Sequence, residues 1–203
     1  MIISAAELWS RLRRAAEGDD DDPLIIAPSP TAQTLPAGGA AVDLRLGTWF
    51  LSLRSARVPH LSAGETGNES RLAKLHYVCF GDEYFLHPGG FVLGITLEWL
   101  RMPRDVAAYV IGKSSWGRRG LIIATATGVH PGFAGCLALE LSNVGEVPIG
   151  IRPGMTICQL FVETVHPPID AEPLRSQYAG GRKPKLGQPR MDEMARRLAQ
   201  PAD

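Results

Sequence analysis

The sequence is short of cysteine, of net charge and of long apolar runs, and each shortage excludes a class of protein. Its three cysteines, Cys79, Cys136 and Cys158, lie far apart and lack the Cys-x-x-Cys spacing of a zinc or redox site. The 21 Lys and Arg residues balance 21 Asp and Glu residues, so no global field would attract nucleic acid or an anionic membrane. No run is apolar for long enough to span a bilayer, and the first residues lack the pattern of a secretion signal. We therefore expect buried thiols, no zinc, no nucleic-acid or membrane partner, and a cytoplasmic location.

The chain is long enough for one core and a tail. With 203 residues, 45% hydrophobic and 21% charged, it can bury a single core, so we expect one domain over residues 1–167. Beyond Pro167 the sequence is rich in Pro, Gly, Lys and Arg as far as Pro189, which opposes autonomous structure. Residues 168–203 are predicted to be a tail that is either disordered or ordered as a lid over a ligand, with a short helical pattern at 191–198.

The remaining segments indicate a mainly β fold that opens with one short helix. Apolar residues recur at helical spacing over 4–17, Ser4 is a suitable N-cap, and the acidic run 19–22 is expected to end the helix as a solvated turn. The span 60–74 is polar and is interpreted as a mobile surface excursion. Short apolar runs between Gly and Pro residues predict the strands of a barrel or sandwich: Leu24–Ile26, Val42–Leu46, Phe91–Leu97, Val106–Ile111, Leu137–Leu141 and Ile157–Val162.

The segment from Gly112 to Gly120 gathers groups that suit a polyphosphate. It holds two hydroxyls, three cations and flanking glycines within nine residues, directly after a predicted strand. Glycines let backbone N–H groups approach phosphate oxygens, and Arg or Lys supplies charge-assisted hydrogen bonds. The order of residues is not that of a P-loop. The alternative is a basic hairpin turn.

A second segment, Gly128–Leu141, is a Gly/Pro turn that leads into a strand. Leu137, Leu139 and Leu141 share one face of that strand, so Cys136, Ala138 and Glu140 point the other way. Glu140 is then either an ordinary outward-facing carboxylate or a functional one. The small size of its two neighbours leaves room for a ligand beside it.

Five segments occur in an order that resembles the dCTP deaminase branch of the trimeric dUTPase superfamily: Val42–Gly47, Phe85–Gly89, Gly112–Gly120, the strand that ends at Glu140, and Pro153–Leu160. The match covers most of residues 20–165. The resemblance implies a dUTPase-type protomer, a distorted β-barrel or jelly-roll-like fold. It also implies a homotrimer whose active sites are shared between neighbouring subunits.

The resemblance further assigns roles to residues of this chain. The loop Lys113–Arg118 would hold a pyrimidine nucleoside triphosphate, with magnesium bound through the phosphate oxygens. Glu140 would be the general base, Ser114 and Arg118 would position the water and stabilise the developing charge, and the backbone around Ala126 would place the base and the water. The residues expected to contact the nucleotide are Lys113, Ser114, Ser115, Trp116, Gly117, Arg118, His130, Phe133, Ala138, Leu139, Glu140, Gln159, Tyr178 and Arg182.

Three positions outside the tail depart from the family's pattern. His130 stands where the family has an aspartate at the sugar 3′-hydroxyl, which argues against pyrophosphate cleavage unless His130 is merely a packed turn residue. Lys113 replaces an arginine and loses its bidentate fork. The stretch between Arg118 and Gly128 is one residue short, where the pyrimidine pocket is expected. Phe133 takes the place of an aromatic residue that packs on deoxyribose, and a core position suits it equally.

The tail departs further from the pattern. Tyr178 matches a tyrosine of the family, but Gln177 replaces a lysine and Gly181 replaces a glutamine. The tail carries other cations that could close over the phosphates instead: Arg182, Lys183 and Lys185.

The function that the sequence predicts is the zinc-independent hydrolytic deamination of dCTP to dUTP and ammonia. No His-x-Glu or Cys-x-x-Cys pattern of the zinc deaminases is present, and one carboxylate can shuttle both protons of the reaction. Two alternatives remain: a dUTP diphosphatase or bifunctional deaminase and diphosphatase, and a catalytically silent nucleotide-binding regulator.

Overall fold

Antiparallel strands make up most of the chain in the computed structural model, which describes residues 1–54, 72–124, 128–166, 168, 170, 179–187 and 192–198. One sheet has the order β4-β3-β6-β10-β8, with β1 paired to β6 outside this order. Its strands are β1 (Ile25–Ala27), β3 (Trp49–Leu53), β4 (Ala73–Tyr77), β6 (Phe91–Arg101), β8 (Leu121–Ile123) and β10 (Ala134–Asn143).

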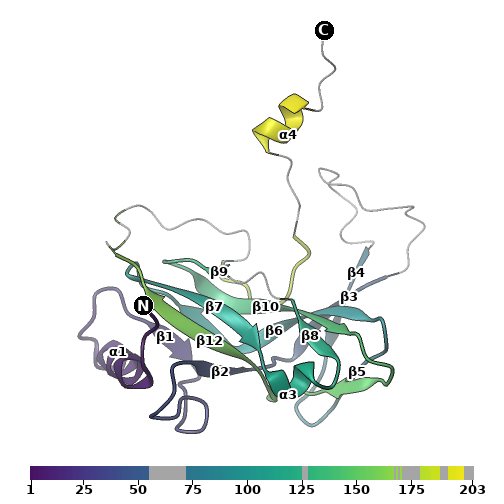
Figure 1. The fold of residues 1–203 in the computed structure, drawn as a ribbon, viewed down its shortest axis with the longest axis horizontal. Helices are drawn as coiled ribbons and strands as arrows, with labels where there is room; N and C mark the ends of the chain where they lie inside the picture. Colours follow the sequence, from purple (N-terminus) through teal and green to yellow (C-terminus); the bar gives the residue numbers. More distant parts are fainter. Residues whose placement is uncertain are drawn as a thin grey trace.

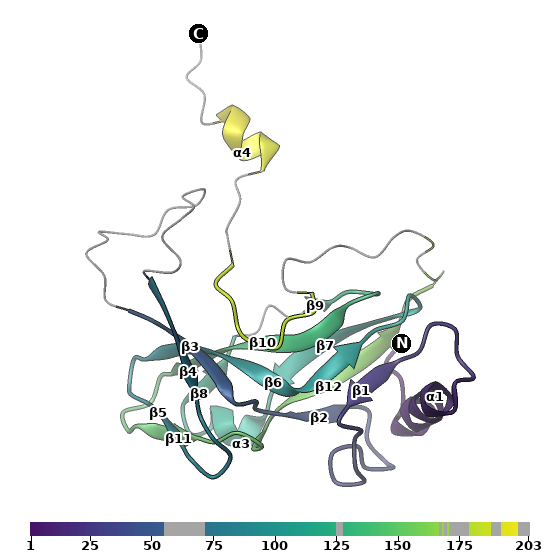
Figure 2. The ribbon, with the colours of Figure 1, turned by 180° about the vertical axis from the view of Figure 1, so that it is seen from behind.

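A second sheet has the order β2-β12-β7-β9, and a separate pair of short strands joins β5 to β11. The strands are β2 (Val42–Arg45), β7 (Val106–Gly112), β9 (Gly128–Val129), β12 (Thr156–Thr164), β5 (Tyr84–Leu86) and β11 (Ile149–Ile151). In both views β7 and β12 lie across from β6 and β10 (Figures 1 and 2). The two larger sheets share one apolar core, to which β10 contributes Leu139 and β12 contributes Leu160. The predicted mainly β fold class is confirmed.

The N-terminal helix, α1 (Ala5–Glu17), begins as predicted and ends for a different reason. The Ser4 hydroxyl oxygen accepts a hydrogen bond from the Glu7 N–H at 3.4 Å, and Leu8 is fully buried. Gly18 ends the helix in the left-handed conformation (φ +79°), which glycine adopts without steric cost. The acidic run that follows is not simply solvated, because Asp22 is half-buried and accepts from the Arg104 N–H at 2.8 Å.

Each of the six runs predicted as strands corresponds to a strand, and α4 (Glu193–Leu198) falls within the helical pattern of the tail. The predicted surface excursion is wrong at its C-terminal end, because Ala73 and Lys74 pair with β3 as part of β4. Residues 60–71 of that excursion lie outside the described residues, and Leu72 is described. Within the described parts of the chain, no helix is both long and apolar enough to cross a membrane.

Candidate active site

The loop after β7 makes one helical turn, α3 (Ser114–Gly117), and then enters β8. The Arg118 N–H closes the turn by donating to the Ser114 carbonyl oxygen at 2.9 Å. Gly120 has φ +87°, and a Cβ atom there would lie 2.7 Å from the Gly145 backbone nitrogen, so only glycine fits. The exposed residues of this loop are Ser114, Ser115, Gly117, Arg118 and Arg119.

Trp116 anchors the loop to the core. Its indole N–H donates to the Thr156 carbonyl oxygen at 3.1 Å, and its half-buried ring packs against the core. The Arg119 guanidinium lies 5.3 Å from the centre of that ring. Because the indole already packs against the core, Trp116 would contact a nucleotide through its backbone.

Lys113 and Gln159, both predicted to contact the nucleotide, meet on a third residue that the sequence did not single out. The Lys113 ammonium lies 2.6 Å from one carboxylate oxygen of Asp43, and the Gln159 amide donates to the other at 2.9 Å. All three side chains are half-buried. Asp43 therefore offsets the charge of Lys113. Arg118 is exposed and has no ion pair among the described residues, so its positive charge is available to a ligand.

A double-mutant cycle on Asp43→Asn and Lys113→Met measures this link. We expect a coupling energy of about 0.5–3 kcal/mol in the free energy of unfolding, because the two groups form one short charge-assisted contact. Chemical denaturation of the four proteins at one concentration gives the value. Strictly additive effects of the two substitutions would contradict a direct pair.

A second ion pair, more deeply buried, joins the two large sheets beside this cluster. The Arg45 guanidinium on β2 lies 2.6 Å from the Glu98 carboxylate on β6, and the Arg45 N–H donates to the other oxygen at 2.8 Å. Glu98 is only 2% exposed. Burial, together with the carboxylates of Glu98 and Asp43, raises the pKa of Cys158 to about 12. Cys158 is therefore a neutral core thiol and not a nucleophile. The expectation of buried thiols is confirmed for Cys158 and wrong for Cys79, which is exposed.

The strand β10 presents Glu140 as predicted. Residues along it alternate between buried and half-buried, and Glu140 shares the half-buried face with Cys136 and Ala138. The side chain of Leu139 is fully buried in the core, so the predicted contact of this residue with the nucleotide stays a prediction for its backbone. The face around Glu140 has the small neighbour, Ala138, that a ligand beside the carboxylate requires.

Near Glu140, the outer edge of β10 is covered by β8, the strand that follows the loop 112–120. β8 pairs with β10 over Leu141–Asn143, and the Ala124 N–H then donates to the Glu140 carbonyl oxygen at 2.9 Å. Residues 125–127 follow directly. The predicted contact Ala126 is among them and lies outside the described residues, as does Tyr178 in the tail.

The tail covers the other end of the same edge. The Gly180 N–H donates to the Ala134 carbonyl oxygen at 2.7 Å, and the Cys136 N–H donates to the Gly181 carbonyl oxygen at 3.0 Å. Between this contact and β8, the edge of β10 at Ala138 pairs with neither segment. Peptide groups on such an edge can hydrogen-bond a planar ring that carries donors and acceptors.

The turn before β10 exposes His130 and packs Phe133 against the core. Gly132 has φ +77°, and the Phe133 N–H donates to the His130 carbonyl oxygen at 3.1 Å. The Phe133 ring is half-buried against the core, which agrees with the packing interpretation. His130 is exposed, and its imidazole has no partner among the described residues.

One chain does not bring the predicted groups into contact. Neither Ser114 nor Arg118 forms a hydrogen bond or ion pair with Glu140 in the described parts of the molecule. Those parts also contain no group of three or more His, Cys, Asp and Glu side chains that could hold a metal ion. Among the described residues, the loop and Glu140 therefore make no direct polar contact with each other.

The fold of this mainly β domain is shared with a solved enzyme structure. The crystal structure of 2′-deoxycytidine 5′-triphosphate deaminase from Agrobacterium tumefaciens matches 79% of this chain with a TM-score of 0.59 and 22% sequence identity. The match spans 46% of that longer chain. At this identity the likeness establishes the fold.

The sequence itself establishes the family. Residues 3–165 match the family model described as dCTP deaminase-like, and the chain belongs to this family. It is 40% identical over 171 residues to "dCTP deaminase, dUMP-forming" of Halobacterium salinarum, with 84% of each chain covered. It is also 40% identical over 192 residues to "dCTP deaminase" of Natronomonas pharaonis, with 91% of this chain and 93% of the relative covered.

Proposed function

We propose that this protein catalyses the hydrolytic deamination of dCTP to dUTP and ammonia. The observation that carries the proposal is the position of Glu140 in a member of the dCTP deaminase-like family. Its half-buried carboxylate stands beside the small Ala138, where the edge of β10 has no strand partner among the described residues between β8 and the tail. A pyrimidine ring would lie there with its C4 amino group toward the carboxylate.

Glu140 would handle both protons of the reaction. It takes one proton from a water molecule as the water oxygen bonds to C4 and passes that proton to N3 of the ring, which gives a neutral tetrahedral intermediate. It then takes the remaining proton from the C4 hydroxyl and delivers it to the amino nitrogen, the C4–N bond breaks, and ammonia leaves a uracil ring. A single carboxylate suffices because it passes on each proton before it takes the next.

The triphosphate would lie on the exposed loop. Ser114, Ser115 and Arg118 offer two hydroxyls and an unpaired guanidinium, and Gly117 permits close approach of the backbone. Lys113 contributes less than its charge suggests, because Asp43 already pairs with it. Magnesium would be carried by the phosphate oxygens, and no protein zinc is needed for the proposed chemistry.

The lack of a polar contact between the loop and Glu140 among the described residues supports a site shared between subunits of a homotrimer. Glu140→Gln and Arg118→Ala, each inactive alone, should then recover part of the activity when they are mixed under conditions that exchange subunits. Light scattering of each protein checks that it is trimeric before and after mixing. No recovery from trimers shown to have exchanged, or full activity from a stable monomer, would contradict the shared site.

A panel of cytosine and uracil nucleotides tests the function itself, with ammonia and pyrophosphate measured separately. Ammonia from dCTP without pyrophosphate is the expected result. Chelation of magnesium should lower the rate, whereas a zinc-selective chelator should not. Pyrophosphate from dUTP without ammonia from dCTP would mean a diphosphatase, and neither product would mean a silent nucleotide-binding protein.

The second candidate function is the conversion of dCTP to dUMP. It is supported by similarity to relatives named "dCTP deaminase, dUMP-forming" as well as to relatives named "dCTP deaminase". The chain is 42% identical over 140 residues to "dCTP deaminase, dUMP-forming" of Dictyoglomus turgidum, with 68% of this chain and 70% of the relative covered. Similarity to the two kinds of relative is nearly equal, so identity does not separate the products. His130 argues against cleavage, because a histidine replaces the aspartate expected at the sugar.

His130 provides a prediction of its own. Replacement by Asp should change the ratio of kcat/KM for dCTP over CTP by a few-fold or more, because the exposed side chain of the turn is expected to face the sugar. Steady-state kinetics with the two nucleotides measures the ratio. An unchanged ratio would assign His130 to the turn alone.

A further inference from the structure

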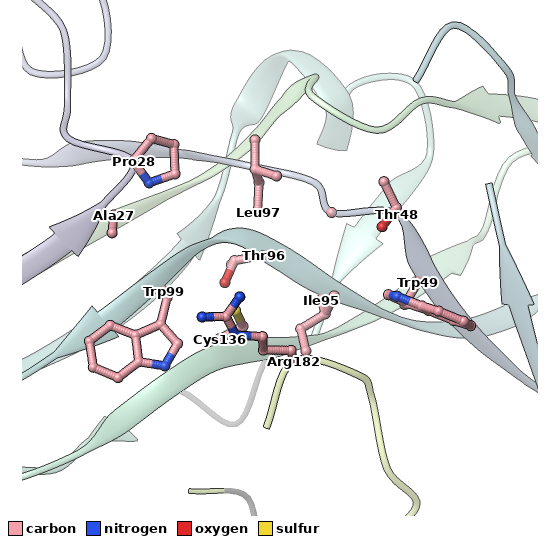
Figure 3. A pocket seen from close by; sticks show the side chains of 11 residues that line it. Ala27, Pro28, Thr48, Trp49, Ile95, Thr96, Leu97, Trp99, Cys136 and Arg182 are labelled. Atoms are coloured by element: carbon pink, nitrogen blue, oxygen red, sulfur yellow. The ribbon is translucent and has the colours of Figure 1, made fainter. Parts of the chain in front are cut away.

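A pocket of about 450 Å³ opens over the middle of β6. It lies where β3 and β1, which pair with opposite ends of β6, separate from each other. Its volume is within the range of pockets that bind small molecules. Figure 3 shows the side chains that give it its chemistry: Thr48, Trp49, Thr96, Trp99, Cys136 and Arg182.

Several donors in this pocket have no partner among the described residues. The indole N–H groups of Trp49 and Trp99 and the hydroxyl of Thr48 make no hydrogen bond there, although both indoles are half-buried. The contrast is with Trp9 and Trp116, whose N–H groups donate to backbone carbonyl oxygens at 3.2 and 3.1 Å. The pocket thus combines two aromatic faces with unused donors, which a ligand can satisfy.

The pocket is also positively charged. The guanidinium of Arg182 lies between the two indoles in Figure 3, and the ammonium of Lys183 lies 3.9 Å from the centre of the Trp49 ring. No acidic side chain lines the pocket, and neither cation has an ion pair in the described parts of the chain. An anionic ligand would therefore meet donors and positive charge without a competing carboxylate.

The pocket is distinct from the proposed deaminase site. Its lining residue on β10 is Cys136, four positions from Glu140 and so about 13 Å away along the strand. The tail runs from Cys136, where Gly181 is bonded, to Trp49, where Lys183 lies, and so crosses the sheet beside the pocket. Neither Glu140 nor Ala138 lines it.

We propose that this pocket is a second ligand site, which takes a planar aromatic ring bearing an anionic group, of about the size of a nucleoside monophosphate. The ring packs against Trp49 and Trp99, and the anionic group meets Arg182, which the tail carries into the pocket. The site does not depend on the proposed deaminase function, because it uses none of the groups assigned to that reaction apart from Arg182. Its ligand is either a nucleotide or an aromatic acid.

The indole ¹H–¹⁵N resonances test the proposal directly, because the full chain has four tryptophans. AMP is the probe, since a purine monophosphate is not a substrate for cytosine deamination. AMP should shift the resonances of Trp49 and Trp99 and leave those of Trp9 and Trp116 unchanged. Adenosine and inorganic phosphate, each with half of the recognised chemistry, should shift them less at equal concentration. Benzoate in place of AMP distinguishes an aromatic acid from a nucleotide.

Variants make the outcome decisive. Arg182→Met should weaken the AMP response at least several-fold, Trp99→Leu should weaken the response of Trp49, and Glu140→Gln should leave both responses intact. The indole resonances that remain in each variant, three in Trp99→Leu and four in the others, show whether it is folded. The proposal is overturned if neither AMP nor benzoate shifts Trp49 and Trp99, or if the shifts persist unchanged in Arg182→Met. Loss of deaminase activity in Glu140→Gln with retained AMP binding separates the two sites.

Discussion

Glu140→Gln should lower kcat for dCTP by about 10²- to 10⁴-fold, toward the upper end, while the affinity for dCTP stays close to that of the wild type. The exchange keeps the size of the side chain and removes the basic oxygen, so the nucleotide still fits while the water loses its proton acceptor. Single-turnover rates of ammonia release and equilibrium binding of dCTP give the two quantities separately.

Glu163→Gln is the matched control, because Glu163 is a half-buried strand carboxylate on β12 outside the candidate site. It should change neither the rate nor the affinity appreciably. A Glu140→Gln protein that binds dCTP normally and keeps more than about a tenth of the wild-type kcat would contradict the proton-shuttle role. Loss of folding together with loss of binding would instead mark Glu140 as a structural residue.

Glu98→Gln should lower the free energy of unfolding by about 3 kcal/mol, near the lower end of the cost of removing one partner from a buried ion pair. Glu98 accepts two hydrogen bonds from Arg45 and links the two large sheets, so the substitution leaves a guanidinium facing the core without a counter-charge. Arg45 keeps partial contact with solvent, which is why the lower end applies. Denaturant unfolding at one protomer concentration measures the change.

The double variant Arg45→Met with Glu98→Leu identifies the cause of that loss. Replacing both charges by apolar side chains removes the uncompensated guanidinium, so the double variant should be more stable than Glu98→Gln alone. Equal stability of the single and double variants would mean that the loss came from packing and not from the buried charge.

The sequence predicted those features that depend on local periodicity. The alternation along β10 placed Glu140 and Ala138 on one face correctly, and the spacing after Ser4 placed α1 correctly. Both patterns are set by backbone geometry and by one apolar core, so neighbouring residues suffice to predict them. Six strands were missed. β5, β8, β9 and β11 have only two or three residues, which carry too little alternation, and β3 and β4 have five residues each but do not alternate strictly between buried and exposed positions.

Features that join distant parts of the chain could not be predicted from periodicity. Asp43 contacts Lys113 across the β2-β12-β7 ladder, and an alternating run such as 42–46 does not distinguish a surface carboxylate from one with a partner. Trp49, Trp99 and Arg182 come from two strands and the tail. They come together because β1 and β3 pair with opposite ends of β6, and this pairing cannot be predicted from the local sequence pattern.

The docking of the tail has a consequence for how such a protein can diversify. Gly180 and Gly181 hold the tail to β10 through backbone atoms, and a Cβ on Gly135 would come within 3.2 Å of the Gly180 nitrogen. The attachment of the tail therefore depends little on the side chains that the tail carries, provided that the glycines remain. A position such as 182 can then change during evolution, and the tail can present new ligand chemistry while its attachment to β10 is kept.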